Sequence, residues 1–72
     1  MLTYKLYKKV EDESMDSVLE FVYKNADQKC LLIIDANYYI KRYEWQDILY
    51  YVHIKNGAVS KICIYQKENR YE

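Results

Sequence analysis

The sequence of 72 residues has no proline, one glycine, one histidine and two cysteines. A single histidine and the absence of a Cys-x-x-Cys pair exclude an ordinary zinc site, which needs four Cys or His ligands. Because Gly57 is the only glycine, a glycine-rich phosphate-binding loop is also excluded. The longest wholly apolar run, Cys30 to Ile34, is far too short to cross a bilayer. We therefore expect no metal, no cofactor and no membrane partner.

The two cysteines and the N-terminus bear on the cellular compartment. The opening residues, MLTYKLYKK, lack the apolar segment of a secretory signal. Two isolated thiols in such a chain, Cys30 and Cys63, are typical of a reduced cytosolic protein. We expect a cytoplasmic location. A single bridge between the two cysteines is the alternative if their strands are neighbours.

Neither sign of charge is in excess, because eleven Lys and Arg residues balance eleven Asp and Glu residues. A general nucleic-acid-binding protein normally carries a clear positive excess. The charges are nevertheless distributed unevenly. The segment Glu11 to Glu20 is acidic and contains no base, whereas basic residues outnumber acidic ones between Ala36 and Lys67. We expect one negative end and a mildly positive sheet.

The short chain predicts one domain of residues 1–72 with marginal stability. A domain of this size buries only about 60% of the surface that its unfolded chain exposes. Small domains are usually reinforced by disulfides, a metal or a partner subunit. Since the sequence favours neither of the first two, association with itself or with another protein is the expected reinforcement.

The N-terminal part of the chain predicts a strand followed by a helix. Leu2 to Val10 alternates with a period of two, which is typical of a strand. Ser14 is a suitable N-cap, and the carboxylate of Asp16 would lie in the first helical turn, where the helix dipole favours it. The helical pattern fades at residues 25–27. Its apolar stripe consists of Met15, Val18, Leu19, Val22 and Ala26.

Two further strands are predicted in the middle of the chain. Lys29 to Ala36 contains five consecutive apolar residues, which suits a central strand covered on both faces. Asp35-Ala36-Asn37 then has the composition of a turn. The segment Tyr38 to Trp45 alternates, and we interpret it as a strand that turns into the next one at residues 44–47. A short helix beginning at Asn37 is the alternative.

The stretch from Ile48 to Tyr65 predicts a β-hairpin around Asn56-Gly57. We expect a three-residue loop, residues 55–57, with Gly57 in the left-handed region. This register pairs Ile54 with Ala58 and gives a consistent apolar face. That face consists of Ile48, Tyr50, Val52, Ile54, Ala58, Ser60, Ile62 and Ile64.

A two-residue loop would instead place Lys61 on the same face as Ile48 and Val52. The three-residue loop is preferred because burial of one apolar face specifies the register. The polar residues 66–72 that follow the hairpin are expected to fray.

These elements predict an α+β fold, in which one helix packs on one face of an antiparallel sheet of four or five strands, in the order β-α-β-(β)-β-β. The odd positions of the hairpin would form an open face that is apolar and aromatic rather than polar. The segment Tyr38 to Trp45 would extend this face. The candidate partner-binding residues are Tyr39, Tyr43, Trp45, Leu49, Tyr51, His53, Lys61, Cys63 and Tyr65.

Tyr, Trp and a few charges form the usual composition of protein-binding hot spots. We therefore expect a non-enzymatic, homodimeric protein-binding module that acts as an inhibitor or adaptor of a larger host protein. The abundance of Lys, Ile, Asn and Tyr fits an AT-rich bacterial or phage genome. Small phage and mobile-element proteins often block host defence nucleases, as anti-CRISPR proteins do. The alternative explanation is structural, because tyrosines are good strand formers and small proteins cannot hide all their apolar surface.

Binding of single-stranded nucleic acid is the second functional hypothesis. Exposed aromatics on a sheet can stack on bases, and nearby cations can contact phosphates. The cations would be Lys41, Arg42, Lys55, Lys61 and Lys67. The zero net charge counts against this hypothesis.

An enzyme is the least favoured class, because no acid, base or nucleophile is paired in the sequence. His53 as a general base, Asp35 as a catalytic acid and Cys63 as a reactive thiol each lack a partner. The acidic residues 11–13 are better explained as a solvated helix entrance than as a cation site. No catalytic residue is therefore assigned.

Overall fold

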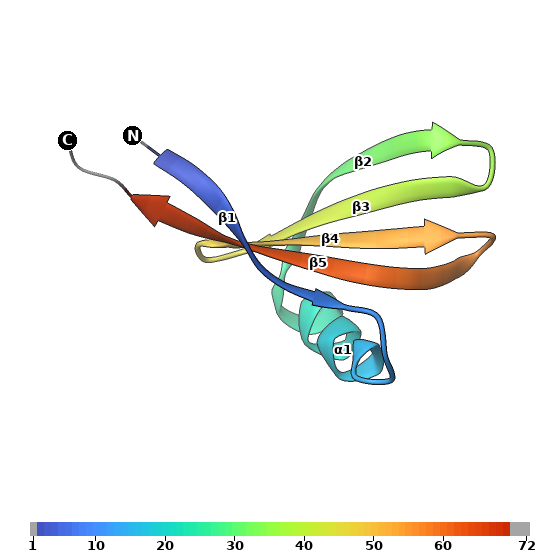
Figure 1. The fold of residues 1–72 in the computed structure, drawn as a ribbon, viewed down its shortest axis with the longest axis horizontal. Helices are drawn as coiled ribbons and strands as arrows, with labels where there is room; N and C mark the ends of the chain where they lie inside the picture. Colours follow the sequence, from blue (N-terminus) through green and yellow to red (C-terminus); the bar gives the residue numbers. More distant parts are fainter. Residues whose placement is uncertain (1, 70–72) are drawn as a thin grey trace.

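The computed structural model describes residues 2–69 as one helix and five strands. The element order along the chain is β1, α1, β2, β3, β4, β5 (Figure 1). The bounds are β1 Leu2–Val10, α1 Met15–Asn25, β2 Asp27–Asp35, β3 Tyr38–Trp45, β4 Ile48–Lys55 and β5 Ala58–Asn69. The expected α+β class is confirmed, and Tyr38–Trp45 is a strand rather than a helix.

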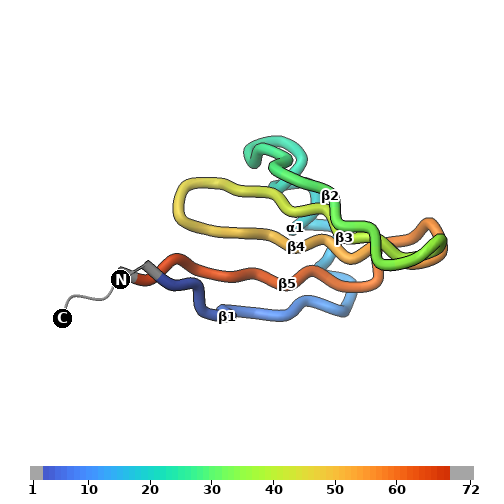
Figure 2. Tube along the Cα trace, turned by 90° about the horizontal axis from the view of Figure 1, so that it is seen from above, coloured from blue at the N-terminus to red at the C-terminus, as the bar shows by residue number. Residues whose placement is uncertain are grey.

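All strands belong to one antiparallel sheet with the spatial order β1-β5-β4-β3-β2. Strands β1 and β2 are adjacent in sequence but form the two opposite edges, and α1 carries the chain from one edge to the other (Figure 1). Seen from above, β2 and β1 lie on opposite sides of β5, β4 and β3 (Figure 2). The helix therefore lies on one face of the sheet and leaves the other face open.

Helix α1 packs through the apolar stripe that its spacing predicts. Val22 is fully buried, and the other stripe residues are half-buried against the sheet. Ser14 occupies the N-cap position, but its side chain makes no capping hydrogen bond. Its hydroxyl instead donates to the carboxylate of Asp12, which also accepts the Ser14 backbone N–H at 2.9 Å. The expected side-chain cap is therefore replaced by a local turn upstream of the helix.

The hydrophobic core lies between α1 and the central strands of the sheet. Val52 and Ile62 face each other across β4 and β5 and are fully buried with Val22. Aromatic rings close the core at its margin: Phe21 packs edge-on against Trp45 at 4.9 Å between ring centroids, and Tyr23 lies 5.7 Å from Tyr43. The helix-covered face of the hairpin contains the predicted Ile48, Tyr50, Val52, Ile54, Ile62 and Ile64, but Val59 takes the place predicted for Ala58 and Ser60, which are exposed.

The β4–β5 hairpin has a two-residue loop, so the predicted three-residue loop is wrong. Lys55 pairs with Ala58, and both loop residues, Asn56 and Gly57, have positive φ angles of 53° and 80°. Positive φ at both positions is the requirement of a type I′ turn, whose twist matches that of the flanking strands.

A register shift between His53 and Ile54 then keeps the apolar face continuous. The shift leaves Ser60 outside the pairing, and its hydroxyl donates to the His53 carbonyl at 3.3 Å. Beyond it, His53 pairs with Lys61 and Val52 with Ile62. The extra residue restores the alternation that a regular two-residue hairpin would lose, because a bulge places two residues opposite one.

Strand β2 corrects another expectation, because it is an edge strand and not a central one. It pairs only with β3, and its four apolar residues are exposed on both faces. Their exposed fractions are 48% for Leu31, 45% for Leu32, 73% for Ile33 and 56% for Ile34. A continuous apolar run is thus not by itself evidence of burial on both faces.

The C-terminal segment is also more ordered than expected. Strand β5 continues to Asn69, because residues 66–69 pair with residues 2–5 of β1. The part of the predicted frayed tail beyond residue 69 lies outside the described residues. No helix among residues 2–69 is both long enough and apolar enough to cross a membrane.

Candidate binding face

The strand registers determine which residues belong to the open face, by which we mean the sheet surface that α1 does not cover. Tyr43 pairs with Tyr50 and Tyr39 with Ile54, so both tyrosines lie on the helix-covered face. Trp45 pairs with Ile48 and contacts Phe21 of the helix. The expectation that these three aromatics extend the open face is wrong, because β3 pairs with β4 in a register that sends them to the core.

The open face is formed by cross-strand rows of side chains. One row runs from Cys30 through Arg42 and Tyr51 to Cys63. A second runs from Leu32 through Ile40 and His53 to Lys61. Five of the nine candidate partner-binding residues lie together on this face. These are Leu49, Tyr51, His53, Cys63 and Tyr65, which share one depression, and Lys61 lies beside them opposite His53.

The predicted residues are not equally accessible. Leu49 is only 5% exposed, whereas Tyr51 and Tyr65 are half-buried. The two tyrosine rings pack edge to face, with their centroids 5.3 Å apart. Leu49 therefore supports the open face from beneath and offers a partner little surface of its own.

A depression with a volume of about 370 Å³ lies on this face. Strands from both edges contribute to it, because Tyr4 comes from β1 and Leu32 from β2. These two residues are 44% and 45% exposed, so they are the accessible rim of the depression. Its complete lining is Tyr4, Leu32, Ile40, Leu49, Tyr51, His53, Cys63 and Tyr65.

His53 is held by a neighbour that the sequence analysis did not single out. Its Nδ1 lies 2.6 Å from the hydroxyl of Tyr38, which donates to it when the imidazole is neutral. Burial, and secondly the positive charge of Lys61, lower the pKa of His53 below its ordinary value. The histidine is therefore neutral near pH 7 and serves as a hydrogen-bonded wall of the depression.

Arg42 supplies positive charge beside the aromatic side chains. A hydrogen bond that the guanidinium donates to the Tyr51 side chain, and secondly the nearby Cys30, raise the pKa of Arg42. Its Nε atom is buried and has no hydrogen-bond partner among the described residues. Together with Lys61, Arg42 makes this part of the open face cationic, which agrees with the expected positive sheet.

The two cysteines lie in one cross-strand row of the open face. Cys63 and Cys30 are both free thiols. They lie on β5 and β2, which are separated by two strands, so about 14 Å of sheet lies between them. Residues 2–69 hold no cluster of three or more His, Cys, Asp or Glu side chains that suits a metal ion.

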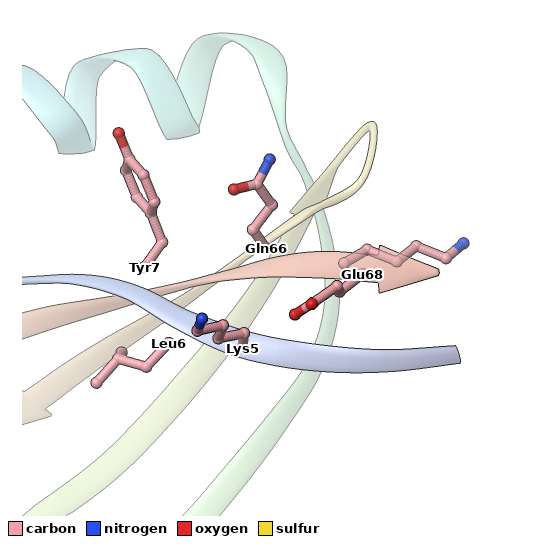
Figure 3. Close-up of a pocket in the computed structure, with 6 residues that line it drawn as sticks. Lys5, Leu6, Tyr7, Gln66 and Glu68 are labelled. Atoms are coloured by element: carbon pink, nitrogen blue, oxygen red, sulfur yellow. The ribbon is translucent and has the colours of Figure 1, made fainter. Parts of the chain in front are cut away.

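A second cavity, of about 520 Å³, lies at the β1 edge of the sheet. Its lining side chains point to opposite sides: Tyr7 and Gln66 point toward the helix, and Leu6 points away (Figure 3). Lys5 and Glu68 lie beside the strand edge in the same view. Because this space wraps around an edge instead of forming one concave surface, it is a weaker candidate than the depression of the open face.

The sequence analysis missed three residues that line the depression, because it did not predict where their strands lie in the sheet. Tyr4, Leu32 and Ile40 reach the depression because β1 and β2 are the edges and β3 pairs with β4. The alternation of Leu2 to Val10 placed Tyr4 on one side of its strand, but nothing in the sequence indicated which face of the sheet that side joins.

Comparison with protein-family models, with curated proteins and with solved structures found no match.

Proposed function

We propose that this chain is a non-enzymatic protein-binding module that acts in the cytoplasm as an inhibitor or adaptor of a larger protein. The observation that carries the proposal is the depression of the open face, which combines an accessible apolar rim with aromatic and cationic side chains. Such a composition is typical of surfaces that dock another protein. The corresponding biological role is the one considered above for small phage and mobile-element proteins, namely interference with a host defence enzyme.

Charge restricts the partner further. Arg42 and Lys61 flank the depression, while the acidic segment of residues 11–20 leads into and forms part of the helix on the other face. Complementary charge accelerates encounter and selects orientation. The partner surface should therefore be acidic, with an apolar or aromatic group that enters the depression between Tyr4 and Leu32.

The test is affinity capture from the native host with three forms of the chain, followed by mass spectrometry. The wild type and Lys24→Glu, which changes an exposed charge on α1, should capture the same protein. Lys61→Glu should lose it, because the reversal lies on the open face beside His53. If Lys61→Glu captures the protein as well as Lys24→Glu does, the open face is not the binding surface.

Binding of single-stranded nucleic acid is the second candidate, because tyrosines and cations share the open face. The packing of Tyr51 against Tyr65 counts against it, since both rings are half-buried and already in contact. Base stacking requires an accessible ring face. Titration with a labelled oligonucleotide at two salt concentrations separates the candidates, because binding to phosphates weakens steeply as salt rises.

A further inference from the structure

The free edge of β2 is an unusual surface for a folded chain. Four consecutive apolar side chains are exposed along it, and Ile33 is the most exposed at 73%. Edge strands with unpaired backbone groups are templates for pairing with another strand, and proteins normally protect them with charges or bulges. Contiguous apolar patches larger than a few hundred Å² are also rare on soluble monomers.

The other edge of the sheet is protected in this way. Strand β1 carries Lys5, Lys8 and Lys9, and a register shift lies between Leu6 and Lys8. Strand β2 has register shifts near its two ends but only one lysine, Lys29, and its middle is apolar. Both edges therefore contain register shifts, and they differ in the number of lysines, which also discourage strand pairing.

The sequence of β2, DQKCLLIID, is complementary to itself in one antiparallel register. A two-fold axis through such a pair places one residue opposite its own copy. With the axis at Leu32, Leu31 faces Ile33 of the second copy, and Lys29 faces Asp35. The apolar residues meet one another in the middle, and an opposite-charge pair forms at each end.

Neighbouring registers lack this complementarity. With the axis at Leu31, Asp27 would face Asp35 of the second copy, and two like-charge pairs would form. With the axis at Ile33, Asp35 would face Leu31 and Lys29 would lose its acidic partner. Like charges directly opposite each other destabilise a strand pair, whereas exposed ion pairs contribute little energy, so the charges select the register and the apolar contacts stabilise it.

We propose that β2 pairs with β2 of a second copy, antiparallel about Leu32, and forms a dimer with one continuous sheet across both chains. The outer edges of that sheet are then both β1, whose lysines oppose further addition. Assembly therefore closes at two chains. This inference is independent of the partner surface proposed above, although Leu32 belongs to the rim of the depression, so the second chain would border it.

The first experiment measures oligomeric state by size-exclusion chromatography with light scattering at about 100 μM. The wild type should have twice the 8.8 kDa mass of the chain, and Ile33→Lys should be a monomer. Tyr7→Lys is the matched control, because Tyr7 is 69% exposed on the opposite edge and its replacement should leave the dimer intact. Circular dichroism of each variant shows that the fold is retained.

The second experiment tests the register in a Cys30→Ser, Cys63→Ser background. Leu32→Cys places two thiols directly opposite each other, and mild oxidation should convert the chain to a disulfide-linked dimer. In Ile33→Cys the two Cα atoms are separated by about 8 Å, beyond the range that a disulfide spans, so this variant should remain unlinked.

A monomeric wild type, a dimeric Ile33→Lys or equal cross-linking of both cysteine variants would overturn the proposal. Species larger than a dimer would also overturn it, since they require pairing that does not close. Failure of the open face as a partner surface is measured separately by the Lys61→Glu capture experiment. If Ile33→Lys is monomeric and still captures the partner protein, the β2 dimer and partner binding by the open face are separate properties of the chain.

Discussion

Tyr38 and His53 are joined by a hydrogen bond of 2.6 Å on the open face, where burial, and secondly Lys61, lower the pKa of the imidazole. The phenol donates to the unprotonated Nδ1, and protonation of that nitrogen would reverse the bond, with Nδ1–H donating to the phenol oxygen. Lys61 lies on the same cross-strand row and opposes a second positive charge. The hydrogen bonding of the open face therefore depends on pH through the protonation of His53.

The lowered pKa of His53 predicts that stability falls as the solution is acidified. The unfolded chain takes up a proton near the ordinary histidine pKa of 6.5, whereas the folded chain takes it up at lower pH. The free energy of unfolding should therefore be constant above pH 6.5 and decrease as pH falls from there through the folded pKa. Urea unfolding between pH 7.5 and 5.5 measures this slope, and NMR titration of the imidazole gives its midpoint directly.

The control is His53→Gln. The chain has one histidine, so no other imidazole titrates in this range. The variant should show a smaller slope than the wild type between pH 6.5 and 5.5. An imidazole midpoint above 6.5 in the folded chain would contradict the prediction.

At the scale of the elements, β5 and β2 both contain isoleucines, but the two strands bury them to very different extents. Both are rich in isoleucine, but Ile62 of β5 is fully buried whereas Ile33 of β2 is largely exposed. Ile62 lies under α1 and is paired on both sides, with Val10 of β1 and Val52 of β4. The position of a strand in the sheet, and not its composition, determines how much a given isoleucine stabilises the fold.

This contrast predicts unequal effects of the same substitution. Ile62→Val should lower the free energy of unfolding by about 1 kcal/mol, because a methylene is removed from a closely packed site. In a chain of this size, that change corresponds to a decrease in melting temperature of about 4–8 °C. Ile33→Val should change stability by less than about 0.5 kcal/mol, because the side chain is on the surface.

For Ile62→Val, thermal unfolding in the Ile33→Lys background, which removes any contribution from chain association, measures the change in stability. For Ile33→Val the comparison uses the wild type at low micromolar concentration. Equal losses of stability would mean that the two isoleucines have equivalent surroundings, contrary to the burial described above.

At the scale of the whole molecule, the strand order decides which distant residues become neighbours. Helix α1 carries the chain across the sheet, so β1 and β2 become the two edges, and β1 pairs with β5 from the opposite end of the chain. The β2–β3 and β4–β5 hairpin turns meet at one end of the sheet, where the Asn56 N–H donates to the Asn37 carbonyl at 2.8 Å. These long-range contacts join all five strands among residues 2–69 in one sheet.

The same strand order predicts the behaviour of the two cysteines. Cys30 and Cys63 lie in one cross-strand row but on strands separated by β3 and β4, which is beyond the reach of a disulfide. After mild oxidation of the folded chain at low concentration, both thiols should react with a thiol reagent in denaturant. Loss of both reactive thiols from a monomeric species would contradict the strand order.

Sequence alone determined the elements of this protein, because local physics specifies them. Alternation predicted β1 and β3, helical spacing predicted α1, and Asn56-Gly57 predicted the hairpin, since each signal depends on residues close in the chain. Six members of the even face of the hairpin were also predicted correctly, but the two-residue loop and the bulge at Ser60 were not, and Val59 packs against the core in place of Ala58 and Ser60. Away from the loop, the two-residue loop with a bulge buries the same residues as the three-residue loop, so their burial did not distinguish the two loops.

Only the tertiary structure decided where each element lies in the sheet. The apolar run of β2 suits a central strand or an unprotected edge equally well, and the path of α1 makes it an edge. The face assigned to Tyr39, Tyr43 and Trp45 likewise depended on the register between β3 and β4. A shift of one residue exchanges the two faces of a strand, and that choice is made by the packing of the whole core against the helix.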